Sequence, residues 1–158
     1  CMEQATDRCK MYCGEKNQMY SALSEELARM YNAAGRREES LACHLAVRNQ
    51  LLKNGYREGS ILLMVDNNMS VVYLDLGRPE EAIPYLTEAL ELTKENGLVG
   101  SAVAEPTWNL ARVYRALGDE EKEDIYLKAA VEGFRECYPP EHPKRIAAEQ
   151  RLKERQGE

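Results

Sequence analysis

The sequence offers few side chains for metal or covalent chemistry. They are five cysteines and two histidines: Cys1, Cys9, Cys13, Cys43, Cys137, His44 and His142. Cys9 and Cys13 are spaced to share one helix face, but together with Cys43 and His44 they match no zinc signature. The odd cysteine number fits no disulfide framework and favours a reducing cytoplasmic setting. We therefore expect buried structural cysteines and no metal site.

Catalytic motifs are equally hard to find. No Ser/His/Asp or Cys/His set is apparent, and Asn54-Gly55 lacks the strand and the Gly-Lys-Ser/Thr of a phosphate loop. His44 is expected to pack between helices and His142 to cap one. The sequence thus predicts a protein that is not an enzyme, without catalytic residues or a cofactor.

Charge and hydropathy narrow the classes of partner. The formal net charge is −6 and the isoelectric point about 5.2, which argues against nonspecific nucleic-acid binding. The longest apolar run, Ile61 to Val65, is far short of the roughly 18 residues of a membrane span. We expect no nucleic-acid partner and no membrane insertion.

Two series of residues recur with one period. Tyr31, Tyr73 and Tyr114 are spaced by 42 and 41 residues, and each precedes a glycine by four residues. A second series, Gly14, Gly55 and Gly97, is spaced by 41 and 42 residues. Each glycine follows a stretch of helical spacing, where a left-handed C-cap is favoured. Ser60 and Ser101 precede apolar runs as expected N-caps.

These glycines and serines mark the expected ends and starts of helices, and the sequence between them shows no strand pattern. We expect helices near 17–34, 37–53, 60–76, 79–95, 102–117, 120–137 and 142–155. Leu23, Leu27, Met30, Tyr31 and Ala34 lie on one side of the first of them. Pro106 lies several residues into its helix, which is expected to kink or to start late.

These residues resemble the tetratricopeptide repeat. Leu27-Ala28 and Leu110-Ala111 precede tyrosines as in that family, and Glu80 to Leu90 reads as its second helix. The period near 42, longer than the usual 34 or so, together with Asn67-Asn68 and Glu141-His142-Pro143, is similar to the kinesin-light-chain subtype. Ser40 and Glu123 depart from the pattern, which has alanine at their places.

The resemblance implies an all-α, right-handed α-solenoid of antiparallel helix pairs. A single array would span 1–158, with repeats at 17–54, 60–96 and 101–138 and a C-terminal helix at 141–156. Residues 1–13 would be the second helix of a truncated repeat. Their bare edge predicts either a longer parent protein or self-association. A lipid-modified Cys1 is the alternative interpretation of that end.

In such arrays the first helix of each pair lines a concave groove for an extended peptide or a partner helix. The stripe beside the core tyrosines gives the expected groove residues. They include Glu25, Glu26, Met64, Asp75 and Glu105, and the binding candidates among them are Arg29, Asn32, Asn67, Asn68, Val71, Trp108, Asn109, Arg112 and Arg115.

Five of these residues suggest particular roles. Asn68 and Asn109 are 41 residues apart and could clamp a peptide backbone, or could simply face water. Arg112 and Arg115 could hold a carboxylate or pair with neighbouring acids. Trp108 could anchor a partner or pack in the core.

The sequence therefore favours a protein- or peptide-interaction module, with an acidic or carboxylate-bearing peptide as its expected ligand. The alternative is the ligand-sensing domain of a bacterial peptide-responsive regulator.

Overall fold

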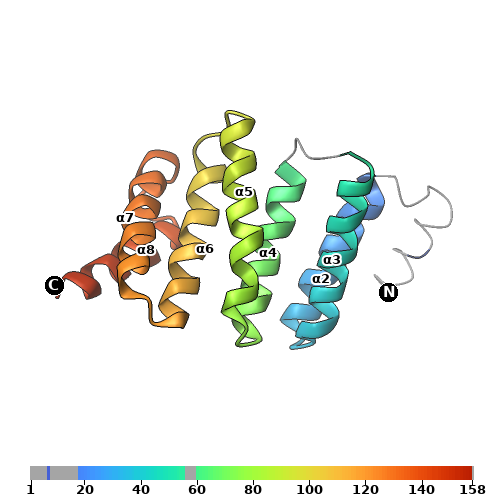
Figure 1. Ribbon diagram of the computed structural model, residues 1–158, viewed down its shortest axis with the longest axis horizontal. Coiled ribbons are helices and arrows are strands. Elements are labelled where there is room, and N and C mark those ends of the chain that lie inside the picture. Colours follow the sequence, from blue (N-terminus) through green and yellow to red (C-terminus); the bar gives the residue numbers. More distant parts are fainter. Residues whose placement is uncertain (1–6, 8–17, 56–59, 158) are drawn as a thin grey trace. The chain divides into compact units, whose positions relative to one another are not determined.

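The computed structural model describes residues 7, 18–55 and 60–157, and within them all regular structure is helical (Figure 1). The helices are α2 (Gln18–Ala33), α3 (Arg37–Lys53), α4 (Ser60–Asp75), η1 (Pro79–Ala82), α5 (Ile83–Glu95), α6 (Ser101–Leu117), α7 (Glu120–Cys137) and α8 (Pro143–Gln156). The expected all-α fold is confirmed. The helix expected over residues 1–13 and the turn glycines Gly14 and Gly59 lie outside the described residues.

Repeated glycines end the helices, as predicted. Gly118 closes α6 with a φ of 73°, which lets the N–H of Asp119 donate to the carbonyl of Tyr114 over 3.0 Å. Gly35 has a φ of 76°, and the N–H of Arg36 donates to the carbonyl of Tyr31 over 2.9 Å. A side chain is strained at positive φ, so glycine is the residue that allows these sharp turns.

One proline and one cap differ from the predictions, at Pro84 and at Ser101. Pro84 lacks an N–H and its ring crowds the carbonyl of residue 80, so the segment before it is the 3₁₀ turn η1 rather than α-helix. Pro106 is accommodated inside α6, which starts at Ser101 and not late. Ser101 is the first helical residue and Gly100 the N-cap, with a φ of 66° that favours glycine.

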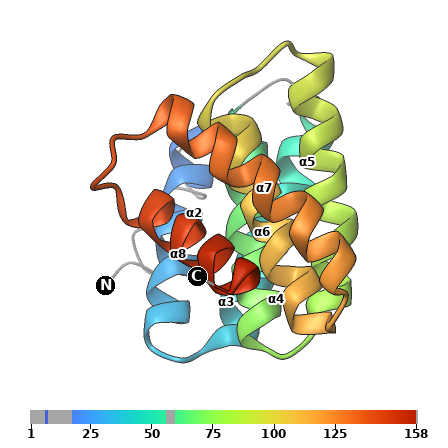
Figure 2. The ribbon, with the colours of Figure 1, turned by 90° about the vertical axis from the view of Figure 1, so that its left-hand side faces the viewer.

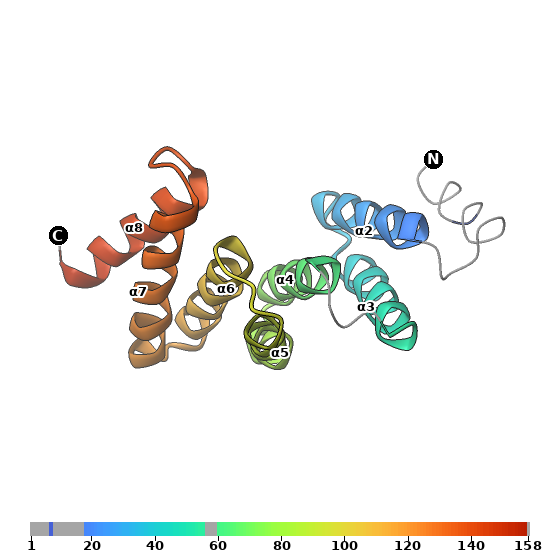
Figure 3. The same cartoon turned by 90° about the horizontal axis from the view of Figure 1, so that it is seen from above.

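The chain divides into two compact units, Cys1–Gly77 and Arg78–Glu158. Their boundary falls inside the expected repeat 60–96, between its two helices. In the first unit α3 packs against both α2 and α4 (Figure 3). Val47, Leu62, Met69 and Tyr73 form the centre of its core. Met30, which the pattern grouped with the core side of α2, is 49% exposed.

In the second unit α6 packs against α5 and α7, and α8 packs on α7 (Figure 2). Leu127, Val131 and Phe134 of α7 form its core with Ala104 and Ala148. Helices α6 and α7 approach closely at Gly133. A methyl group at that position would lie only 2.9 Å from Cβ of Ala104. Small residues at this crossing therefore set the spacing of the pair.

Both departures from the family pattern are buried and bonded. Ser40 is fully buried, and its hydroxyl donates to the carbonyl of Ala28 over 2.7 Å. Glu123 is 3% exposed, and Arg151 of α8 donates to its two carboxylate oxygens over 2.7 and 3.1 Å. A buried carboxylate is tolerated only with such a partner, so α8 completes the folding of α7.

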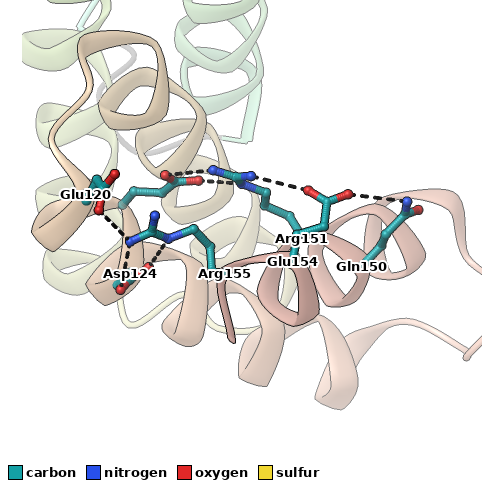
Figure 4. Close-up of polar contacts among 7 residues, drawn as sticks. Glu120, Asp124, Gln150, Arg151, Glu154 and Arg155 are labelled. Atoms are coloured by element: carbon teal, nitrogen blue, oxygen red, sulfur yellow. Dashed lines mark hydrogen bonds and ion pairs between the residues drawn. The ribbon is translucent and has the colours of Figure 1, made fainter. Parts of the chain in front are cut away.

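A second arginine of α8 reaches α7 nearer to solvent (Figure 4). Arg155 bonds to Asp124 over 2.8 Å and lies 3.3 Å from Glu120. The guanidinium beside Asp124 holds the pKa of that carboxyl below its usual value. These acids are 38% and 73% exposed, so water screens both ion pairs.

The two arginines should therefore differ in their effect on stability. Arg151→Ala leaves Glu123 buried without its partner and is expected to lower the free energy of unfolding by about 3 kcal/mol. Arg155→Ala, the matched control, should lower it much less, because water already screens its ion pairs. Urea unfolding followed by circular dichroism measures both. Glu123→Ala combined with Arg151→Ala should recover part of the loss, and equal losses for the two single arginine variants would contradict this account.

Candidate functional site

A hollow of about 280 Å³ lies in the first unit, between α2 and α4 and next to α3. It is lined by Arg29, Asn32, Ala33, His44, Asn68, Val71 and Val72. The α2 residues Arg29, Asn32 and Ala33 lie three and four positions apart, as do Asn68, Val71 and Val72 on α4, so each set shares one helix face. Four predicted groove residues, Arg29, Asn32, Asn68 and Val71, thus line one hollow.

A buried polar network joins the three helices beside this hollow. Nδ1 of His44 lies 2.9 Å from Oε1 of Glu25, and Nδ2 of Asn68 donates to Oε2 of Glu25 over 3.2 Å. Glu25 is 2% and His44 1% exposed. The carboxylate therefore holds side chains of α3 and α4 at once and fixes the shape of the hollow.

Sequence reasoning found His44 but missed its partner. His44 was expected to pack between helices, and it does. Glu25 was expected to face the groove, yet its side chain points inward. A signal was available: His44 stands where the repeat family usually has an aromatic residue, and a buried polar side chain must find a partner. The residue that supplies this partner, 19 positions away, could not be recognised from periodicity.

The other polar groups of the hollow are arranged differently. Oδ1 of Asn32 is buried and accepts no hydrogen bond from any residue in the described part of the chain. Arg29, with a side chain 61% exposed, forms an ion pair with Glu26 one helical turn away. Asn67 is half-buried and is not among the lining residues.

In the second unit the remaining predicted groove residues lie on α6. Asn109 is 7% exposed and its Oδ1 accepts from Nη1 of Arg112 over 3.3 Å, so the structure brings these two together. Arg115 is exposed in the last turn of the helix. Trp108 is half-buried with its ring edge-on to Phe134, the centroids 6.4 Å apart. Both a core role and a surface role of Trp108 are compatible with this position.

Glu105, one turn before Asn109 on α6, bonds to Tyr138, which follows α7, and to Lys144 of α8. It accepts from the hydroxyl of Tyr138 over 2.5 Å and pairs with Lys144 over 2.7 Å. Burial, together with the Glu105 carboxylate, raises the pKa of Tyr138 to about 12. This part of the expected groove stripe therefore stabilises the chain's own fold.

The ranges 18–55 and 60–157 contain neither a candidate metal cluster nor a candidate membrane span. Their histidines, cysteines and acids form no cluster of three suited to a metal ion. None of their helices combines the length and apolar character needed to cross a membrane.

The Glu25–His44 contact is expected to be important for stability. His44→Leu removes a donor from a carboxylate that is 2% exposed, and should lower the free energy of unfolding by about 3 kcal/mol. Adding Glu25→Met removes the buried charge and should restore much of the loss. Urea unfolding of the two variants checks this, and a double variant no more stable than the single would show that the pair is not the cause.

Comparisons with known proteins agree with this architecture. The sequence profile of the tetratricopeptide repeat matches residues 18–95 and 60–136. Two crystal structures of a putative kinesin light chain with nearly identical TPR-like repeats, from Podosopora anserina, superpose with TM-scores of 0.80 and 0.77. Each is 22% identical and is matched over 76% of its length by 99% of this chain. BtubC (BKLC) from P. vanneervenii follows, with a TM-score of 0.71, 19% identity, and coverage of 87% of this chain and 63% of that one.

A curated sequence relative is the Fanconi anemia group G protein homolog of Mus musculus, 36% identical over 75 residues. The match takes in 48% of this chain but spans only 11% of that protein. It therefore concerns only a small part of that relative. Together with the glycine-terminated helix pairs, the two overlapping profile matches show that the chain belongs to the tetratricopeptide repeat family, whose fold serves protein–protein interaction.

Proposed function

We propose that this chain binds an extended peptide segment of a partner protein and that the hollow between α2 and α4 is one of its contact points. The observation that carries the proposal is the meeting of Arg29, Asn32, Asn68 and Val71 at one hollow. The sequence pattern by itself predicts all four as groove residues.

The chemistry of the hollow supports a peptide. Val71, Val72 and Ala33 offer apolar contact, while Asn32 and Asn68 offer amide groups for hydrogen bonds. Binding sites combine these two kinds of surface, because apolar burial supplies affinity and a few polar groups fix orientation. A volume of about 280 Å³ suits one side chain with its adjoining backbone rather than a folded domain.

The second unit offers further candidate contacts on α6. Arg115 is exposed there, and Trp108 keeps part of its ring at the surface. Tryptophan and arginine are enriched among the residues that dominate binding energy. In this proposal Trp108 and Arg115 are secondary contacts. Their neighbours Asn109 and Arg112 bond to each other and are not counted among the contacts.

A substitution that fills the hollow tests the proposal. Ala33 is exposed and lines the hollow, so Ala33→Trp would occupy the space without removing a hydrogen bond. Peptides selected from a random displayed library on the unmodified chain should bind this variant at least about tenfold more weakly. Isothermal titration measures the affinity, and the melting temperature should stay unchanged.

The matched control is Ala46→Trp. Ala46 is exposed on α3 and is not among the lining residues, so the same substitution there should leave peptide affinity unchanged. Equal affinity of the peptides for the chain and for Ala33→Trp would overturn the assignment of the hollow.

A further inference from the structure

We propose that the hollow between α2 and α4 selects a guanidinium group, so that the preferred peptide carries an arginine there. The peptide part of this inference rests on the proposed function, whereas the selectivity of the hollow is a property of its own side chains. The proposed arginine is opposite in charge to the acidic ligand that the sequence favoured.

The first argument is the orientation of the Asn68 amide. A carboxylate can only accept hydrogen bonds, so the group of Asn68 that lies 3.2 Å from Oε2 of Glu25 must be the donor Nδ2. Glu25 is 2% exposed, and this bond helps to satisfy it. The amide therefore cannot turn over freely, and its other end, Oδ1, is left as an acceptor.

Asn32 supplies the second acceptor. Its Oδ1 is buried and receives no donor from the described ranges of the chain, although its residue lines the hollow. An unsatisfied buried carbonyl costs about 1–3 kcal/mol. The terminal torsion of asparagine is soft, so a small rotation brings this oxygen to a ligand donor.

The charges around the hollow favour a cation as that donor. Both basic side chains that line the hollow already contact an acid: His44 contacts Glu25, and Arg29 forms an ion pair with Glu26 on the same helix. A carboxylate ligand would therefore have to compete with these acids, whereas a cation meets the field of Glu25 in a partly dehydrated site.

Among cationic side chains, arginine fits best. Its planar guanidinium presents several N–H donors in a fixed fork and can serve two separate carbonyl acceptors at once. It is also less strongly hydrated than an ammonium, so entering the hollow costs it less. Lysine would place a compact, strongly hydrated charge against the same two acceptors.

Small probes test the selectivity without any peptide. Ethylguanidinium, ethylammonium, propionamide and propionate are titrated separately into the ¹⁵N-labelled 158-residue chain and followed by ¹H–¹⁵N correlation spectra. We expect ethylguanidinium to shift the side-chain amide signals of Asn32 and Asn68 and to bind about tenfold more tightly than propionate. Propionate or propionamide binding as tightly as ethylguanidinium, or no probe shifting these signals, would overturn the proposal.

Two variants examine the cause. Glu25→Gln removes the charge and lets the Asn68 amide turn over, so the preference for ethylguanidinium over propionate should shrink about tenfold. Glu95→Gln, an exposed position on α5, makes the same charge change elsewhere and should keep the preference. If Glu25→Gln unfolds, Asn32→Ala is used instead. It removes one acceptor without breaking a bond to Oδ1 and should weaken ethylguanidinium about fivefold.

The outcomes separate this inference from the proposed function. Peptides that bind in an Ala33-dependent way, combined with no guanidinium preference, would sink the inference and leave the peptide module standing. Guanidinium selectivity without any Ala33-dependent peptide would keep the selectivity and overturn the proposed function. Selected peptides enriched in arginine, with binding lost on arginine to glutamate exchange in the peptide, support both.

Discussion

Each compact unit buries a carboxylate that only a neighbouring helix can satisfy. In the first unit Glu25 of α2 receives His44 of α3 and Asn68 of α4, and in the second Glu123 of α7 receives Arg151 of α8. A charge removed from water costs several kcal/mol unless its partner is in place. These pairs therefore disfavour a slipped register, because a slipped helix would leave the buried charge without its partner.

This constraint explains why two departures from the repeat pattern are tolerated. Alanine is the ordinary residue where Ser40 and Glu123 stand, since two helices must approach closely there. Ser40 keeps the close approach by donating to the carbonyl of Ala28. Glu123 is larger, and it is accommodated because α8 brings a guanidinium to it. The hydroxyl of Ser40 is satisfied by a backbone carbonyl, whereas Glu123 needs a guanidinium that the pattern itself does not contain.

The same network that stabilises the first unit also shapes its candidate binding surface. Glu25 lies below the surface and accepts a hydrogen bond from Nδ2 of Asn68, so it holds the orientation of that amide. A groove residue is therefore not an independent contact, because its donors and acceptors depend on the buried layer beneath it. Asn109 illustrates the point in the second unit, where Arg112 already occupies its carbonyl oxygen.

Much of the fold could be predicted from the sequence because its signals are local. The helix bounds follow from glycines at positive φ, such as Gly35 and Gly118, and from spacing within single helices. The exceptions were also local, but they depend on backbone geometry. The residues before Pro84 form the 3₁₀ turn η1 instead of the first turn of α-helix, and Gly100 is the N-cap where Ser101 was expected.

The site was only half predictable, because its chemistry depends on pairs far apart in the chain. Arg29, Asn32, Asn68 and Val71 could be selected from helical periodicity as residues of one surface. That Glu25 turns inward to meet His44 and Asn68, 19 and 43 residues away, was decided by the tertiary structure. By itself the sequence determined the repeating helices and their exposed stripe. Only folding decided which acids are buried and which amide atoms bond to them, since both depend on what the other helices place beside them.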